Sequence, residues 1–365
     1  MKQTHHRWRL LWVLGLALGV AGVWAGSRGW RIPARELPLP AAASAALREA
    51  LAAGPVPDVA AARGSVPADA QAWVRLARER DAAAARAVQR LARRLSVRIE
   101  PTWVGGVRAY WVRPPEPAAY RGRAMMYLHG GAYVFNAGLA GQAEPVLIAA
   151  RVGIPVLSVD YRMPPTHPFP AALDDALAAW RGAIEDHAPE SMALGGSSAG
   201  GGLALALVHR LKALALPLPG ALYLGTPWSD LSKTGDSYWI NEGVDRLLVT
   251  YDGALGAAAR LYAGGRDLKD VLISPVYGDF TGFPPTTLVT GTRDLFLSLT
   301  VRVHRRLREA GVEAELNVYE GLSHGDYMGL RNTPESRQVY RELDEFLRRH
   351  LSRGGGAPAA APPAV

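Results

Sequence analysis

The chain of 365 residues contains no cysteine. This absence excludes a disulfide framework, a lipid-modified cysteine and a metal site built from thiolates. It leaves the redox compartment open, and nothing in it argues against the periplasm. No internal repeat is evident along the sequence either. A length of 365 residues with 49% hydrophobic and 20% charged residues therefore predicts one enzyme-sized domain with terminal extensions.

The sequence also lacks any motif in which basic and aromatic residues interleave, and it contains no recognised nucleic-acid-binding module. The formal net charge is +8. Removing residues 1–25 takes away Lys2, Arg7 and Arg9 and leaves +5, which is modest for a protein of this size. We interpret the charge as a bias of the surface and expect no nucleic-acid partner.

Strand-like and helix-like patterns alternate from residue 97 onward. This alternation predicts an α/β fold with a mostly parallel central sheet and helices on both faces, over residues 97–352. The segment around residues 236–266 departs from that rhythm, and we expect it to form a lid over the site. Three aromatic residues in or just before this segment are candidates to line the pocket, although aromatic residues more often pack in the core: Trp228, Tyr238 and Trp239.

The pattern Gly-Ser-Ser-Ala-Gly at residues 196–200 lies between a strand-like run at 192–194 and an apolar helix pattern at 203–211. A G-x-S-x-G between a strand and a helix is typical of the nucleophile elbow, where the glycines permit a strained turn that lifts the serine hydroxyl clear of the backbone. We therefore predict Ser198 as the nucleophile. Ser197 does not fit the pattern, because Ala199 would then stand where the second glycine belongs.

A serine hydroxyl is a weak nucleophile, so it needs donors for the oxyanion, a histidine base and a carboxylate that orients the base. The donors are expected from the loop at residues 129–132, which follows the strand-like run 124–128. Its glycines allow main-chain N–H groups to approach the developing charge closely. The predicted oxyanion donors are Gly130, Gly131 and Ala199, the last because it follows the nucleophile.

The predicted carboxylate is Asp294, which follows the strand-like run 287–289. Aspartate in a turn can also be a purely structural cap. Asp279 is the main rival, but no strand directly precedes it to direct it towards the elbow. We therefore favour Asp294.

The predicted base is His324, which lies in a loop after the alternating run 314–319 and completes the chain order serine, aspartate, histidine. His129 is expected to brace the oxyanion loop instead. The other histidines fall in the N-terminal leader, in predicted helices or in a proline-rich loop: His5, His6, His187, His209, His304, His350 and His167.

Together these motifs resemble the bacterial hormone-sensitive-lipase family of esterases, within the α/β-hydrolase superfamily. The resemblance runs from about Trp103 to Leu351, and its motifs are residues 129–131, 160–162, 168–172, 198–201 and 321–324. It implies an α/β-hydrolase fold with an N-terminal helical cap. It also implies a serine carboxylester hydrolase that acts on short- to medium-chain acyl esters through an acyl-enzyme. Such an enzyme needs no metal or organic cofactor.

The sequence departs from the family pattern at several positions. Ala132 stands where the family usually has a third glycine, Ser197 where it has an aspartate, and residues 163–166 where it has Leu-Ala-Pro-Glu. The methyl group of Ala132 narrows the space beside the acyl group, which disfavours bulky alcohol leaving groups. Asp326 stands where relatives often carry an apolar residue; it can tune the pKa of the histidine, but we expect it to face solvent.

The N-terminus has the character of a targeting signal. Three basic residues precede an uncharged stretch at 10–27, and residues 23–25 offer a cleavage site. We expect residues 1–30 to be a signal peptide that directs export to the periplasm or the medium, with an uncleaved membrane anchor as the alternative.

The segments that follow the leader are expected to carry no catalytic chemistry. Residues 31–64 are rich in alanine and proline and predict a linker with one short helix, and residues 353–365 predict a disordered tail. Residues 65–96 predict the helical cap, with a strong helix pattern over 70–95. Its basic face is expected to be solvated, the alternative being contact with a membrane or an acidic partner.

Two other functions stay open at this stage. Residues 291–313 are also similar to bacterial lactone hydrolases of the same superfamily, so the substrate could be a lactone. A non-catalytic binding protein on this scaffold, as in plant hormone receptors that resemble the family, is disfavoured because such receptors lose a triad member and this chain has all three. The sequence does not predict an oligomeric state.

Overall fold

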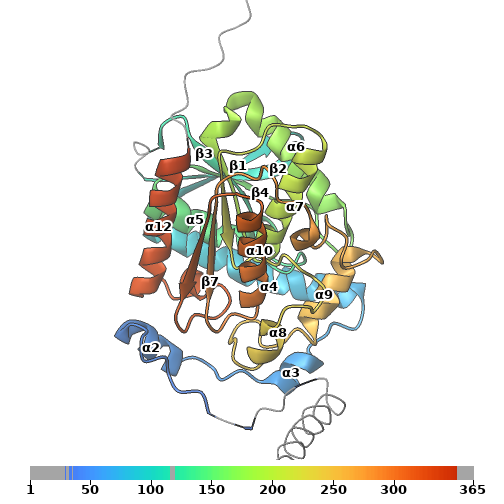
Figure 1. Cartoon of the computed structure of the whole chain (residues 1–365), viewed down its shortest axis with the longest axis vertical. Coiled ribbons are helices and arrows are strands. Elements are labelled where there is room, and N and C mark those ends of the chain that lie inside the picture. The colour runs from blue at the N-terminus through green and yellow to red at the C-terminus, as the bar shows by residue number, and fades with distance from the viewer. Residues whose placement is uncertain (1–28, 30–32, 35, 116–119, 352–365) are drawn as a thin grey trace, which may run out of the picture. The chain divides into compact units, whose positions relative to one another are not determined.

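A computed structural model describes residues 29, 33–34, 36–115 and 120–351 (Figure 1). Apart from residue 29, the predicted leader lies outside the described residues, and so does the predicted tail. The chain divides into two units, Met1–Pro38 and Leu39–Val365, and the fold and the site belong to the second. No helix among the described residues is both long and apolar enough to cross a membrane.

Within the described residues, eight strands form one sheet in the order β1-β2-β4-β3-β5-β6-β7-β8. The second strand pairs antiparallel with both of its neighbours, and all pairs from β4 to β8 are parallel. The mostly parallel sheet predicted from the sequence is confirmed. The strands are β1 (Arg98–Val104), β2 (Val107–Arg113), β3 (Ala124–Leu128), β4 (Val156–Val159), β5 (Met192–Ser197), β6 (Ala221–Gly225), β7 (Thr286–Gly291) and β8 (Ala314–Tyr319).

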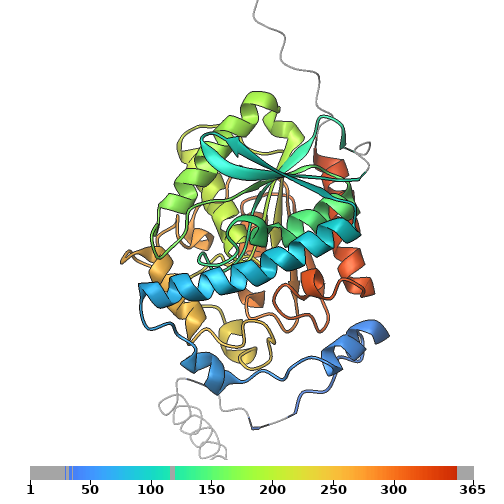
Figure 2. The ribbon, with the colours of Figure 1, turned by 180° about the vertical axis from the view of Figure 1, so that it is seen from behind.

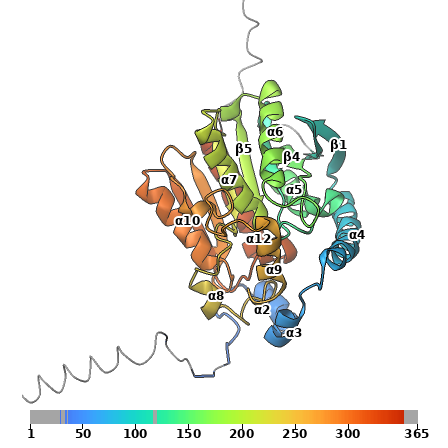
Figure 3. The same ribbon diagram turned by 90° about the vertical axis from the view of Figure 1, so that its right-hand side faces the viewer.

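The central strands are buried along their whole length, because helices cover both faces of the sheet (Figure 3). A strand that is buried on both sides reads as a continuous apolar or small-residue run instead of an alternating one. One face carries α6 (Ala171–Asp186), α7 (Ala199–Ala213) and α10 (Leu297–Glu309). The other carries α5 (Ala143–Val152) and α12 (Pro334–His350).

The cap is a single long helix, α4 (Ala70–Arg94), which lies across the molecule in Figure 2. It begins where the side chain of Asp69 accepts a hydrogen bond from the backbone N–H of Ala72 at 2.7 Å, which satisfies a donor that the first helical turn leaves free. Trp73 near its start and Val88 and Leu91 towards its end are buried, so the helix packs on the domain along its length.

The segment predicted to be a linker contains two short helices, α2 (Ala45–Ala52) and α3 (Val59–Gly64). Leu47 on α2 is fully buried, and Ser44 donates to the carboxylate of Glu335 on α12 from both its backbone N–H (2.8 Å) and its hydroxyl (2.9 Å). On α3, the guanidinium of Arg63 lies 3.0 Å from the carboxylate of Glu242 in the segment 236–266, so both helices are attached to the domain.

The lid segment, residues 236–266, contains α8 (Ser237–Ile240) and α9 (Ala254–Ala263), joined by a loop. The hydroxyl of Ser237 donates to the carbonyl oxygen of Leu295, just after β7, at 2.8 Å. The lid segment thus lies against the loops that follow the carboxyl ends of the parallel strands, where α/β folds place their ligand sites. The remaining short elements are η2 (Gly138–Gln142), η3 (Pro189–Ser191), η4 (Pro275–Tyr277) and α11 (Asp326–Gly329).

Candidate active site

Ser198 sits at the turn between β5 and α7, with φ 57° and ψ −124°. A residue with a side chain rarely adopts this conformation, so the surroundings must hold it. The Ser198 N–H donates to the carbonyl of Gly225 at 2.8 Å, and the Ser198 carbonyl accepts from the N–H of Trp228 at 2.8 Å. A Cβ at Gly200 would collide with the carbonyl of Leu128. The geometry of a nucleophile elbow therefore exists around Ser198.

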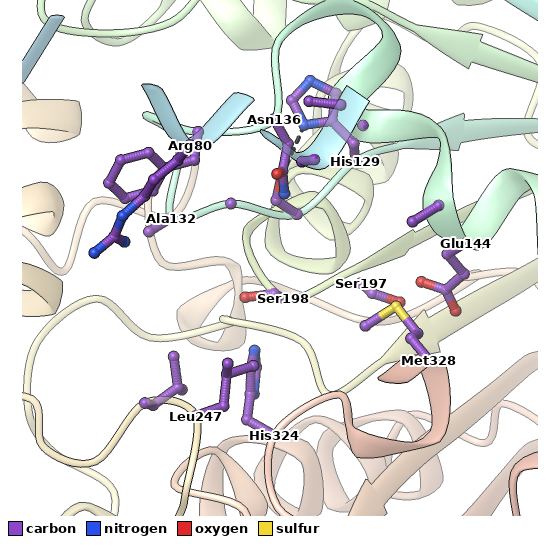
Figure 4. Close-up of a pocket in the computed structure, with 18 of the residues that line it drawn as sticks. Arg80, His129, Ala132, Asn136, Glu144, Ser197, Ser198, Leu247, His324 and Met328 are labelled. Atoms are coloured by element: carbon purple, nitrogen blue, oxygen red, sulfur yellow. Dashed lines mark hydrogen bonds between the residues drawn. The ribbon is translucent and has the colours of Figure 1, made fainter. Parts of the chain in front are cut away.

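The loop after β3 packs directly on this elbow. A Cβ added to Gly130 would lie 2.7 Å from the carbonyl oxygen of Ser197, so only glycine fits there. The Gly130 carbonyl accepts a hydrogen bond from the side-chain amide of Asn136 at 3.0 Å (Figure 4). Asp81 of α4 accepts the backbone N–H of Asn136 at 2.6 Å. The cap helix thereby fixes the loop, a connection that the sequence analysis missed.

His129 is buried and is bonded within its own loop. Its Nδ1 lies 2.8 Å from the carbonyl oxygen of Gly130, and its ring stacks on Tyr161 at 4.2 Å between centroids. Burial lowers the pKa of His129, although the hydrogen bond to Gly130 opposes that effect. A neutral imidazole packed against Tyr161 stiffens the loop.

The structure brings Asp294 and His324 together. Both are buried, and Nδ1 of His324 lies 3.1 Å from Oδ1 of Asp294. The same nitrogen lies 2.8 Å from the hydroxyl oxygen of Thr226, whose own proton goes to Oδ2 of Asp294. Because Nδ1 faces two acceptors, it must carry the ring proton, and Nε2 is left as the acceptor.

Electrostatics favour the charged form of both partners. Burial by itself would raise the pKa of Asp294, but the nearby His324 and the hydrogen bonds from His324 and Thr226 outweigh it, so the pKa lies below its usual value. Burial would lower the pKa of His324, but the charge and hydrogen bond of Asp294 outweigh it, and the pKa is raised. The pair is therefore built to stabilise an imidazolium.

Asp294 is held by a full set of donors. Besides His324 and Thr226, it accepts from the hydroxyl of Thr290 at 2.7 Å and from the N–H of Phe296 at 2.8 Å. Asp279, the rival in the sequence, is exposed and instead bonds Thr281 and the partly buried Lys212; its two hydrogen bonds from Thr281 lower its pKa to about 2. The structure therefore pairs Asp294, and not Asp279, with His324.

Ser198 and His324 line the same pocket, which has a volume of about 610 Å³ (Figure 4). Cavities of this size suit small organic ligands. Other parts of the wall come from the loop after β3, the α4 helix and the lid segment, and include Gly131, Ala132, Phe135, Arg80, Ala84, Val88, Leu247, Leu248, Val249 and Leu255. Among the described residues, no cluster of three or more histidine, aspartate or glutamate side chains could hold a metal ion.

A buried carboxyl group, Glu144 of α5, also lines this pocket. It accepts hydrogen bonds from the hydroxyls of Tyr127 and Tyr223, the second at 2.6 Å. Burial raises the pKa of Glu144, and its hydrogen bonds only partly oppose that effect. Figure 4 shows it beyond Ser197, on the side of the pocket away from Leu247.

One expectation about a neighbouring residue was wrong. Asp326 does not face solvent: it is 5% exposed, and its Oδ1 lies 2.6 Å from the guanidinium of Arg246 in the lid segment. Of the three aromatic candidates for the pocket, Trp228 and Tyr238 instead pack in the core, where the indole N–H donates to the tyrosine hydroxyl at 3.0 Å. Trp239 is exposed to solvent, and the ammonium group of Lys233 lies 3.9 Å from the centre of its ring.

A strained serine at the end of a central parallel strand and a buried Asp–His pair at the neighbouring strand ends define an α/β hydrolase. Comparison with known proteins agrees. The family described as alpha/beta hydrolase fold matches residues 125–328. This chain belongs to that family.

Named relatives include an acetyl-hydrolase of Streptomyces hygroscopicus, which is 33% identical over 69% of this chain and 83% of its own. The crystal structure of esterase E25 is 46% identical, covers 89% of this chain and all of its own, and superposes with a TM-score of 0.87. An esterase from the bacterial hormone-sensitive lipase (HSL) family is 34% identical over 70% of this chain and 85% of its own, with a TM-score of 0.66. The family resemblance seen in the sequence is confirmed.

Proposed function

We propose that this protein is a serine carboxylester hydrolase that acts on short- to medium-chain acyl esters. One observation carries the proposal. Two acceptors, Asp294 and Thr226, fix the ring proton of His324 on Nδ1, and His324 shares a pocket with the elbow serine, Ser198. Relatives named esterase, acetyl-hydrolase and ethyl acetate hydrolase support the same reaction class.

In this reaction Nε2 of His324 takes the proton of Ser198 as the serine oxygen attacks the ester carbonyl. The resulting imidazolium is stabilised by Asp294 until it protonates the departing alcohol. An acyl-enzyme on Ser198 remains, and water, activated by the same histidine, releases the acid. Nucleophile, base and orienting carboxylate all come from the chain itself.

The oxyanion would be held by the N–H groups of Gly130, Gly131 and Ala199. The Gly130 carbonyl is fixed by Asn136. In a trans peptide the N–H of the next residue points the opposite way, so the N–H of Gly131 is directed away from Asn136. Ala199 is the first residue of α7, where the helix dipole adds positive potential.

The pocket supports small or medium acyl groups. Its volume of about 610 Å³ is bounded by apolar side chains from the cap and the lid segment, such as Val88 and Leu255. Ala132, the last residue of the loop 129–132, also lines the pocket, and its methyl group would restrict the width available to the ester. Long acyl chains would need the lid segment to move.

The test is hydrolysis of p-nitrophenyl esters from acetyl to palmitoyl by the full-length protein. We expect turnover to fall with chain length. Ser198→Ala should lower kcat by at least about 10⁴-fold, since the nucleophile is lost. Two control variants should retain turnover: Ser197→Ala, which removes the neighbouring hydroxyl, and Asp279→Asn, which changes the rival carboxylate. Asp294→Asn, by contrast, should be severely impaired.

A Ser198→Ala protein that hydrolyses the series as fast as the wild type would contradict the proposal. If the folded wild-type protein hydrolyses none of these esters, lactone hydrolysis becomes the next hypothesis, and turnover of lactones is measured in the same way. If lactones also fail, calorimetry with the esters tests ligand binding without turnover.

We further infer that residues 1–30 direct export, with retention at the membrane as the alternative outcome. Three basic residues before the uncharged stretch 10–27 support this. Fractionation of cells, with N-terminal sequencing of the recovered protein, separates a cleaved leader in the periplasm or medium from an intact anchor in the membrane fraction. Recovery of the full-length chain from the cytosol alone would contradict export.

A further inference from the structure

A second buried carboxylate lies beside the Asp294–His324 pair. Asp245 belongs to the lid segment and is fully buried. One of its oxygens, Oδ1, accepts the backbone N–H groups of Leu247 and Leu248 at 2.8 and 3.0 Å, which closes a turn within the lid segment. The other oxygen, Oδ2, accepts the N–H of Leu295 at 2.8 Å and the N–H of His324 at 3.3 Å. The two oxygens therefore face different parts of the molecule.

The contacts of Oδ2 reach both loops of the triad. Leu295 directly follows Asp294, and the second donor is the backbone of His324 itself. A third link joins the lid segment to the same place, because the side-chain amide of Asn241 donates to the carbonyl of Asp294 at 2.8 Å. The lid segment and the triad loops thus form one hydrogen-bonded unit.

We propose that Asp245 is a positioning residue for the hydrolysis, whose carboxylate holds the Asp294 and His324 loops together and places a second negative charge beside the imidazole of His324. The proposal rests on the proposed esterase function, in which that imidazole becomes positively charged in the transition state. Asp245 touches neither the substrate nor the serine and acts through His324.

The other charges around the imidazole are accounted for. The ionisable groups that face His324 are Asp294, Asp245 and Asp326. Asp326 is paired with the guanidinium of Arg246, whose Nε and a terminal nitrogen both donate to it. Within the described parts of the chain, Asp245 forms no ion pair, although its charge also acts at longer range on the guanidinium of Arg246, which is itself paired with Asp326.

The electrostatic consequences agree with this geometry. Burial raises the pKa of Asp245 to about 6, with a further rise from the charge of Asp294 and an opposing effect of His324. Above about pH 6 Asp245 therefore carries its charge, and it adds to the effect of Asp294 in raising the pKa of His324. Removing the charge should make the imidazolium less stable.

The experiment compares the pH profiles of wild-type and Asp245→Asn proteins from pH 5 to 9, as full-length chains. The readouts are kcat/KM on p-nitrophenyl acetate and the rate of labelling by a fluorophosphonate probe. Activity rises as His324 loses its proton, so a lower pKa moves the acid limb to lower pH. We expect the acid limb to move down by about one pH unit and the plateau to fall about tenfold.

The matched control is Asn241→Ala, which removes a neutral hydrogen bond between the same lid segment and the Asp294 loop. It should lower the plateau without moving the acid limb. Asp245→Glu retains the charge and should keep the wild-type inflection. An Asp245→Asn profile that inflects where the wild type does would overturn the proposal, and so would an equal shift in Asn241→Ala.

Thermal melting shows whether each variant is folded at the assay temperature. If Asp245→Asn is not, Asp245→Ser replaces it, since the smaller hydroxyl also removes the charge. NMR titration of ¹⁵N-histidine-labelled protein, with His324→Gln for assignment, follows the imidazole directly. The two failures are distinguishable. A wild-type protein without esterase activity would contradict the proposed function only. An unchanged pKa of His324 in Asp245→Asn, followed by NMR, would contradict the role of Asp245.

Discussion

The hydroxyl of Ser197 lies 3.0 Å from the hydroxyl of Tyr327, and this contact joins the last residue of β5 to the helix that follows His324. The Tyr327 hydroxyl also lies 3.2 Å from the hydroxyl of Tyr223, which donates its own proton to Glu144. The elbow and the histidine loop are therefore tied to one buried carboxyl group. A Cβ at Gly225 would collide with both hydroxyls of the first contact, so glycine makes it possible.

Ser197→Asp should damage the protein, even though the related enzymes usually carry aspartate there. The new carboxylate would lie next to Glu144 without a cation, and two buried like charges oppose each other. We expect a loss of stability on the order of 3 kcal/mol, measured by urea denaturation. Adding Glu144→Gln should recover most of that loss in a double-mutant cycle, and additive losses would contradict the explanation.

Thr226→Ala should lower kcat about tenfold and leave KM little changed. Its hydroxyl donates a hydrogen bond to the charged carboxylate of Asp294 and accepts a hydrogen bond from Nδ1 of His324. Hydrogen bonds of this kind contribute about 1.5–3 kcal/mol. Thr226→Ser retains the hydroxyl and is the control. Equal kcat values for the alanine and serine variants would show that the hydroxyl plays no part.

Ala132→Gly should widen the range of accepted alcohols. Ala132 has a φ of 52°, which glycine adopts without strain, so the fold should tolerate the change. It lines the pocket as part of the loop 129–132. We expect the ratio of kcat/KM for tert-butyl acetate to that for ethyl acetate to rise at least about tenfold. An unchanged ratio would place the restriction elsewhere.

His209 should make the fold sensitive to acid, independently of the active site. Its Nε2 donates to the carbonyl of Pro275 at 3.0 Å between two phenylalanine rings, and burial lowers its pKa to about 4. Because the folded pKa lies below the unfolded value near 6.5, this stability is complete above pH 6.5 and is lost as the pH falls towards 4. The loss amounts to about 3 kcal/mol.

Urea denaturation at pH 7 and pH 4.5 measures that loss. His209→Gln retains a donor for Pro275 but cannot be protonated, so its stability should fall less over this interval. A parallel fall in both proteins would assign the acid sensitivity to other groups.

The three residues predicted as the triad could be found in the sequence because their signals are local. Ser198, Asp294 and His324 each follow a strand-like run, and parallel strands bring their carboxyl ends to one edge of the sheet. The fold class followed from the alternation of strand and helix for the same reason. Thr226 also follows a strand, β6, and could have been found by applying this rule to every strand end.

Asp245 and Glu144 could not be predicted in that way. Their roles depend on contacts between distant parts of the sequence, such as that between Asp245 and Leu295, 50 residues apart, and that between Glu144 and Tyr223, 79 residues apart. Asp326 was expected to face solvent because a lone carboxylate after a loop usually does. Its partner, Arg246, lies 80 residues earlier in a segment without strand or helix periodicity. Tertiary contacts of this kind leave no local pattern.

The hydrogen bonds between the lid segment and the triad loops limit how this enzyme can be redesigned. Exchanging residues 236–266 for the equivalent stretch of a relative is an obvious way to graft a new chain-length preference. In this protein such a chimaera would also lose the acceptor for the N–H groups of Leu295 and His324, unless the donor stretch brings its own carboxylate to the same place. A change of the lid segment made to alter substrate preference would therefore also alter the catalytic rate, unless the new segment contains an aspartate at the position of Asp245.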